Sequence, residues 1–169
     1  MKSTKQILVI VLCLALAALA LAGCNRDWAA DYDDDERIGG SVASSSIKGS
    51  SIVTINDTTT FKYNTFNGTK EMWSVNSNGA GAITVDHALE ISKGRFKCVI
   101  VSPDKEVTVL FDETSVDNKS YDVPEGKSII KFVGDDAGVE LVLQLTAEGD
   151  ASLKILGDSS RKQNVSLID

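Results

Sequence analysis

The stretch VELVLQLTA, residues 139–147, decides the fold class of this 169-residue chain. Its apolar side chains stand at every second position, at Val139, Leu141, Leu143 and Leu145, with polar residues between most of them. A period of two is typical of a β-strand that buries one face and exposes the other, whereas a helix would repeat every 3.6 residues. The stretch therefore predicts a half-buried strand.

The same pattern recurs along most of the chain after residue 50 and predicts about ten short strands. The further candidates are residues 51–56, 60–66, 82–86, 88–92, 95–101, 106–113, 120–123, 128–133 and 152–156. Turn signals separate them. SPDK at 102–105 and GDDAG at 134–138 each predict a hairpin, and VPEGK at 123–127 predicts a further turn.

Strands joined by short turns predict an all-β fold, an antiparallel β-sandwich of Ig-like or jelly-roll-like character. The alternative is a single sheet closed on itself. We place the sandwich domain at 51–158, followed by a C-terminal tail or edge strand at 159–169.

The first 23 residues read as a signal peptide. Lys2 and Lys5 precede an apolar run from Ile7 to Leu21. These 15 residues would span about 22 Å as a helix, less than the hydrocarbon core of about 30 Å. A basic start, a short apolar run and small residues at its end are typical of a secretory signal that is removed.

The run ends in Leu21-Ala22-Gly23-Cys24, which resembles the lipobox of bacterial lipoproteins. The resemblance covers residues 1–24 and implies cleavage between Gly23 and Cys24, with the Cys24 thiol joined to a diacylglycerol. Two or three acyl chains hold a protein firmly on a bilayer. The resemblance therefore predicts that acylated Cys24 anchors the protein to membrane lipid, on the extracytoplasmic face of the cell membrane.

Residues 24–50 are acidic and then rich in Ser and Gly, which predicts a disordered tether between the anchor and the domain. The spacing of Asp31, Asp33 and Asp35 resembles an EF-hand calcium loop, but the sixth position holds Glu36 where that loop requires Gly. Trp28 is expected either among lipid headgroups or docked on the domain.

The charge of the mature chain excludes some partners. The formal net charge falls from −7 to −9 on removal of residues 1–23, which hold two lysines and no acid. Nucleic acids are excluded as partners, because binding them requires positive charge. Cys98 is the only cysteine left beyond Cys24 and shares a strand face with Phe96 and Ile100, so we expect a buried thiol.

Sequence motifs give no catalytic residue, metal site or cofactor. His87 is the only histidine and is expected in a turn or on the surface. Four of the chain's aromatic residues lie between residues 61 and 73. The candidate ligand-binding residues there are Tyr63, Asn64, Phe66 and Trp73, since aromatic faces stack on sugars or anchor proteins. The alternative is that Phe61 and Tyr63 pack inward and Trp73 closes one end of the sandwich.

The blocks KCVIVSPDKEVTVLF at 97–111 and YDVPEGKSIIKFVGDDAGVELVLQL at 121–145 resemble small β-sandwich lipoproteins of Gram-positive bacteria. This resemblance implies the fold and the location and brings no activity with it. We predict a non-catalytic, lipid-anchored domain that binds a glycan or an envelope protein. The alternatives are a cell-wall or glycan hydrolase with a carboxylate pair, and an accessory subunit that pairs through an edge strand.

Overall fold

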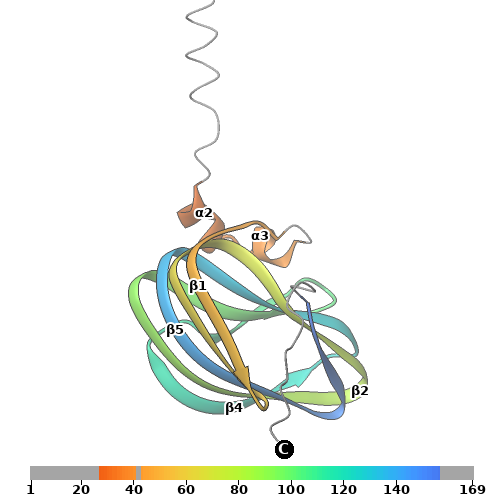
Figure 1. Cartoon of the computed structure of the whole chain (residues 1–169). Helices are drawn as coiled ribbons and strands as arrows, with labels where there is room; N and C mark the ends of the chain where they lie inside the picture. Colours follow the sequence, from red (N-terminus) through yellow and green to blue (C-terminus); the bar gives the residue numbers. More distant parts are fainter. Residues whose placement is uncertain (1–26, 41–42, 157–169) are drawn as a thin grey trace, which may run out of the picture.

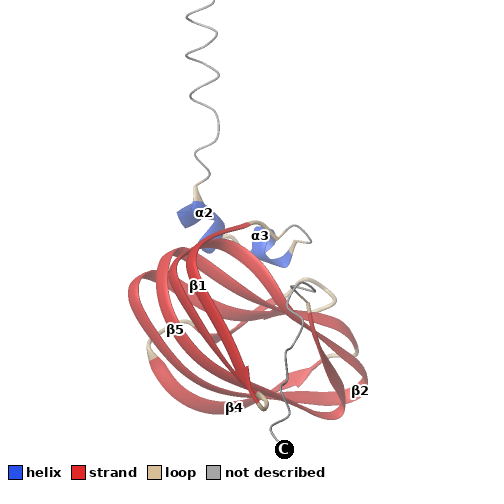
Figure 2. Ribbon diagram, in the orientation of Figure 1, coloured by secondary structure: helices blue, strands red, loops and turns tan. Residues whose placement is uncertain are grey.

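The computed structural model describes residues 27–40 and 43–156 (Figure 1). Two short helices, α2 (Trp28–Tyr32) and α3 (Asp35–Gly39), precede the sheet. The strands are β1 (Ser45–Ile55), β2 (Thr58–Val101), β3 (Val107–Phe111), β4 (Ser115–Val123) and β5 (Gly126–Ile155). They form most of the molecule (Figure 2), and all their pairings are antiparallel. Within these ranges no helix has both the length and the apolar character needed to cross a membrane.

Strands β2 and β5 are long because each runs through both layers of the fold. β5 lies between the two halves of β2, pairing with residues 58–77 on one side and with 81–101 on the other. A straight strand of 30 residues would be about 100 Å long. Both strands therefore bend, and the hydrogen-bonded sheet folds over into two facing layers.

The pairings define the layers. Layer A contains, in order, β1, residues 58–66 of β2, 137–149 of β5, 81–91 of β2, and β4. Layer B contains residues 151–155 of β5, 68–77 of β2, 126–134 of β5, 93–101 of β2, and β3. The predicted antiparallel sandwich is confirmed. In the described chain β1 and β4 each pair on one side only, so layer A keeps two edges and the closed-sheet alternative does not hold.

The core lies between the layers and is rich in aromatic rings. Phe61 of layer A and Phe132 of layer B meet edge to face, with their ring centres 5.2 Å apart. Cys98 is fully buried in the same cluster as Phe96 and Ile100, as the alternation predicts. Burial raises the pKa of the Cys98 thiol far above its ordinary value, which leaves the sulfur protonated and unreactive.

The long strands cross between layers at bends where the register is irregular. In β2 the pairing with β5 shifts on either side of Lys93, and the next residue, Gly94, has φ +64°. A Cβ on Gly94 would stand 2.3 Å from the Asp135 carbonyl oxygen, so only glycine fits there. In β5 the bend includes Asp136, with φ +48°. Strands that change layer through bulges form the corners of such sandwiches.

The hairpin predicted from GDDAG at 134–138 is therefore wrong. These residues are the crossing of β5, and the strand stays paired with β2 through them, Gly134 with both Gly68 and Phe96. Glycine and aspartate indicate that the backbone bends, but they do not distinguish a hairpin turn from a strand that bends into the other layer. The hairpin from SPDK is confirmed, with Val101 paired to Val107, and the turn at VPEGK separates β4 from β5.

The acidic segment differs from the predicted tether. Residues 27–40 form a helical cap, α2 and α3 with their flanking residues, that packs on the outer face of layer B (Figure 1). Each helix begins at an aspartate whose carboxylate accepts a hydrogen bond from a backbone N–H, Asp27 for α2 and Asp34 for α3. Some of the acidic residues whose abundance suggested a tether therefore cap the helices, and others form ion pairs with the sandwich. The prediction of a disordered tether over 24–50 is therefore wrong for two segments: residues 27–40 form the cap, and residues 45–50 belong to β1.

The cap also decides between the two expectations for Trp28. A Cβ at Gly68 would stand 2.5 Å from Cζ3 of Trp28, so the indole lies directly against the bend of β2. Tyr32 is buried as well. Trp28 therefore docks on the domain. Gly23, Cys24 and the tail at 159–169 lie outside the described residues.

Candidate binding site

Two of the predicted ligand-binding residues lie in the core. Tyr63 is 2% exposed and Phe66 is 0% exposed, and their rings stack with centres 5.4 Å apart. Burial raises the pKa of Tyr63 to about 12. The prediction that Tyr63 and Phe66 contact a ligand at the surface is wrong, because both side chains point between the layers and fill the interior.

The other two predicted residues are not brought together. Asn64 is exposed, whereas Trp73 is partly buried and meets Phe61 and Phe132 edge to face. Trp73 lines a small pocket of about 130 Å³ among β1, β2 and the end of β5, with Phe61, Met72 and Ile155. Trp73 therefore packs against the core, as the alternative interpretation predicted for Phe61 and Tyr63, and its position at an end of the sandwich stays a prediction.

A larger pocket opens between the layers, beside the edge strands β3 and β4. Its volume is about 440 Å³, within the roughly 300–1,000 Å³ that small-molecule sites occupy. The lining residues are Ile100, Ser102, Glu106, Thr108, Tyr121, Asp122, Val123, Pro124 and Ser128. We call this the interlayer pocket. Three hydroxyl side chains, one phenol and two carboxylates therefore surround a partly apolar space.

Ser128 is the most unusual residue of the interlayer pocket. It is fully buried, and its Oγ, like the Tyr63 hydroxyl in the core, has no hydrogen-bond partner among the described residues. A buried hydroxyl without a partner costs free energy, and unlike Tyr63 in the core, Ser128 borders a pocket. Alternation along β5 places Ser128 on the same inward face as Ile130 and Phe132, both fully buried. A polar residue on an apolar face was the signal that sequence analysis missed.

Tyr121 is held in a fixed position at this pocket. Its hydroxyl donates a hydrogen bond to the Leu110 carbonyl oxygen at 2.7 Å, and the Lys119 ammonium lies 5.0 Å from its ring centre. Burial, and then the negative charge of Asp117, raise the pKa of Tyr121, so it remains a neutral phenol. A rigid, partly exposed ring of this kind can act as a stacking platform.

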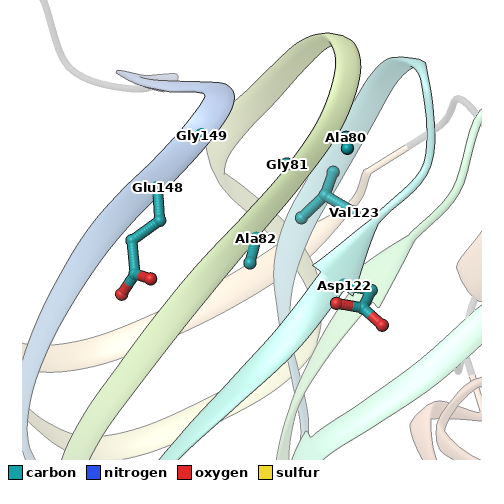
Figure 3. Close-up of a pocket in the computed structure, with 7 residues that line it drawn as sticks. All are labelled: Ala80, Gly81, Ala82, Asp122, Val123, Glu148 and Gly149. Carbon is teal, nitrogen blue, oxygen red and sulfur yellow. The ribbon is translucent and has the colours of Figure 1, made fainter.

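A second hollow adjoins the interlayer pocket and shares Asp122 and Val123 with it (Figure 3). Its floor is formed by the small residues Ala80, Gly81, Ala82 and Gly149, and its volume is about 540 Å³. Asp122 and Glu148 flank Ala82 as its two register neighbours, so their Cα atoms are two strand spacings apart, about 10 Å. Both carboxylates are exposed, and Glu148 accepts a hydrogen bond from Thr84.

His87 was expected in a turn or on the surface, and that prediction is wrong. It lies in β2, is 5% exposed and stacks on Phe111 with ring centres 4.1 Å apart. Its Nε2 lies 3.1 Å from the Ser115 hydroxyl, and its Nδ1 is buried and finds no partner in the part of the chain that the structure describes. His87 shares the inward face of β2 with Val85 and Leu89, which stand two positions before and after it and are buried as well. Burial lowers the pKa of His87, although Asp117 and Asp86 oppose the shift.

This shift predicts a pH-dependent stability. The unfolded chain, with an ordinary histidine pKa of about 6.5, binds a proton more readily than the folded chain. The free energy of unfolding should therefore fall as the pH drops below about 6.5. Urea unfolding of the wild type and of His87→Gln at pH 7.5 and 5.0 checks this. We expect the wild type to lose more stability than the variant; equal losses would contradict the assignment.

Metal ligation finds no support in residues 27–40 and 43–156, where no group of three or more His, Cys, Asp or Glu side chains could hold an ion.

Comparisons with known proteins give little beyond the fold. No family model matches the chain, and no curated protein matches it. One similar solved structure is a mutant of a family 29 carbohydrate-binding module complexed with mannohexaose. It shares 13% sequence identity and covers 62% of this chain and 80% of that chain, with a TM-score of 0.37. A likeness this distant carries no argument about a ligand, so function has to be argued from the pockets themselves.

Proposed function

We propose that this chain is a lipid-anchored protein of the bacterial cell envelope. In this proposal its β-sandwich is a non-catalytic domain that binds a glycan in the interlayer pocket. The location is supported by the short apolar run and the four matching lipobox positions that end at Cys24. The unpartnered hydroxyl of Ser128 at the interlayer pocket is the observation that carries the ligand assignment.

The chemistry around Ser128 favours a polyhydroxylated ligand. Glu106 and Asp122 carry carboxylates that accept hydrogen bonds from sugar hydroxyls, and Thr108 offers a hydroxyl that donates or accepts. Tyr121 supplies an aromatic face, on which the C–H face of a sugar ring stacks. An anionic ligand is disfavoured, because the two carboxylates would repel it.

Binding is favoured over hydrolysis because of where the acids lie. A glycosidase needs one carboxyl group kept protonated, usually by burial, opposite a second carboxylate. The acids at both pockets are exposed: Glu106 and Asp122 line the interlayer pocket, and Asp122 and Glu148 flank the hollow over Ala82. This geometry supports recognition of hydroxyl groups and provides no enclosed site for proton transfer.

Ser128→Ala tests the proposed pocket. Since Oγ makes no hydrogen bond to residues 27–40 or 43–156, we expect the free energy of unfolding to stay the same or rise slightly. Loss of one neutral hydrogen bond should weaken glycan binding about three- to tenfold. Isothermal titration of the first oligosaccharide that a glycan array identifies, drawn from envelope and plant polysaccharides, provides the measurement.

The matched control is Ser50→Ala, which removes an exposed hydroxyl from β1. It should leave both stability and binding unchanged. Equal affinity for wild type and Ser128→Ala would place the ligand elsewhere, and an array without any bound glycan would remove the ligand assignment.

A further inference from the structure

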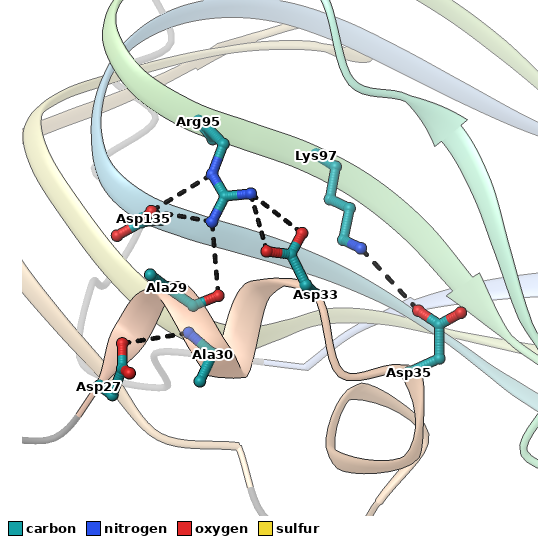
Figure 4. A network of polar contacts seen from close by, with 8 residues as sticks. All are labelled: Asp27, Ala29, Ala30, Asp33, Asp35, Arg95, Lys97 and Asp135. Carbon is teal, nitrogen blue, oxygen red and sulfur yellow. Dashed lines mark hydrogen bonds and ion pairs between the residues drawn. The ribbon is translucent and has the colours of Figure 1, made fainter.

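The helical cap is fixed to layer B by a network of ion pairs (Figure 4). Arg95 donates hydrogen bonds to both carboxylate oxygens of Asp33, each at 2.9 Å, and its other side pairs with Asp135 at 3.0 Å. Lys97 approaches Asp35 at 3.9 Å. Two basic side chains of β2 thus hold acids from both ends of the turn between α2 and α3, which orients the cap as well as attaching it.

Aromatic and apolar contacts lie beneath these ion pairs. The guanidinium carbon of Arg95 lies 4.3 Å from the ring centre of Tyr32, and the Lys97 ammonium lies 4.7 Å from it. Ile38 is 0% exposed and packs in one cluster with residues that face outward from layer B, including Val99 and Val133. The cap therefore covers an apolar surface that would otherwise face solvent, and this favours a docked state.

A buried lysine fixes the end of the cap. Lys131 of β5 is 2% exposed, and its Nζ donates to the carbonyl oxygens of Ile38 at 2.9 Å and Gly40 at 2.7 Å. The same ammonium lies 3.3 Å from the Glu71 carboxylate. Positive charge at carbonyls that end a helix is favourable. The cap is therefore fastened to the sandwich along its whole length.

The docked cap changes how far the domain can move from its anchor. As a flexible chain, the 21 residues from Cys24 to Ser45 would reach about 25 Å root-mean-square and about 70 Å at full extension. With the cap docked, only two residues, Asn25 and Arg26, lie between Cys24 and Asp27, which is part of the cap. The three Cα–Cα steps from Cys24 to Asp27 span at most about 11 Å. Docking thus removes most of the freedom that the acidic composition suggests.

We propose that the surface of the sandwich that carries the cap is its membrane-facing surface and that the docked cap holds the domain in one orientation on the bilayer. This inference rests on the anchoring at Cys24 in the proposed function. The opposite end then faces away from the membrane. β1 starts beside the cap and runs to the turn at Asn56 and Asp57 (Figure 1), and its 11 residues span about 35 Å.

Two positions on the sandwich report its orientation. Asp112 is the residue after β3. Because Phe111 pairs with Cys98, Asp112 lies close to Lys97, whose ammonium contacts the Tyr32 ring of the cap. Asp112 therefore lies beside the cap. Asp57 lies at the far end of β1. Both are exposed, and thiol-reactive dyes will label Asp112→Cys or Asp57→Cys selectively, because Cys98 is buried and Cys24 is acylated.

The experiment uses the acylated protein cleaved before Cys24, which lacks residues 1–23 and with them Cys13, in phosphatidylcholine vesicles that contain a nitroxide-headgroup lipid as quencher. We expect a dye at position 112, beside the cap, to be quenched at least about threefold more than a dye at position 57, since β1 carries the chain about 35 Å from Ser45 beside the cap to the turn that contains Asp57. Ile38→Asp should undock the cap and bring the two values to within about 1.5-fold, as a flexible linker of about 25 Å would.

Ala29→Asp adds the same charge to an exposed position of α2 and should keep the threefold difference. Arg95→Ala is a second undocking variant, which keeps the test decisive if Ile38→Asp fails to fold. Equal quenching at both positions in the parent protein would overturn the proposed orientation. A difference that persists in every folded undocking variant would overturn the role of the cap. The anchor is tested separately with a Cys24→Ser chain that starts at residue 24 and so lacks the apolar run of the signal peptide: if it stays on the vesicles, the anchoring itself is overturned.

Discussion

Phe132→Ala is expected to lower the free energy of unfolding by about 4 kcal/mol, the typical cost of truncating a fully buried phenylalanine. Phe132 is 0% exposed and is in ring contact with Phe61 and Phe96, both at 5.2 Å, and with Trp73 at 5.8 Å. Its removal would leave a cavity between the two layers that these rings cannot fill, because each stands in a different paired segment of β2 and is held there by the sheet. The measurement is equilibrium urea unfolding followed by tryptophan fluorescence.

A loss of this size is a large part of the stability of a small domain, so Phe132→Leu provides a milder step, with an expected cost of about 1–1.5 kcal/mol. Val116→Ala is the control, since Val116 is 82% exposed and should change stability by less than about 0.5 kcal/mol. A cost below about 1.5 kcal/mol for Phe132→Ala would mean that the ring does not join the two layers.

Lys131→Met is expected to lower the free energy of unfolding by about 3 kcal/mol, because it leaves buried polar groups without a partner. Methionine keeps the apolar stem, so the loss isolates the ammonium and its bonds to Ile38 and Gly40. Glu71 would also lose its partner. We further expect hydrogen exchange of the Ile38 and Gly40 amides, which bond within α3 and its end, to accelerate at least tenfold.

Lys127→Met is the matched control on the same strand. Lys127 is exposed, and its substitution should leave both stability and cap exchange unchanged. If Lys131→Met destabilised the protein without faster exchange in the cap, the lysine would act within layer B alone.

The candidate site shows where sequence reasoning fails. The segment from Phe61 to Trp73 was selected for its density of aromatic residues, but a high density is also how a two-layer core is filled, and Tyr63 and Phe66 serve that purpose. The interlayer pocket draws on Ser102, Tyr121 and Ser128, which stand on different strands. No local pattern relates them, since their proximity depends on how two bent strands cross.

The sequence by itself determined the all-β class, the antiparallel pairing at the SPDK turn and the inward face that contains Cys98. These features follow from local rules: a period of two selects a strand, and a proline turn reverses it. The anchoring at Cys24 remains a sequence-based proposal, because that residue lies outside the described structure.

Only the tertiary structure decided the role of the acidic segment. Asp33 and Asp35 resemble solvated tether residues in the sequence, because their partners Arg95 and Lys97 lie about 60 residues away. Equally, the GDDAG bend became a layer crossing because β2 pairs with β5 on both sides of it. Composition fixes how a segment interacts with water, but whether it stays in water depends on the surface that the rest of the chain presents to it.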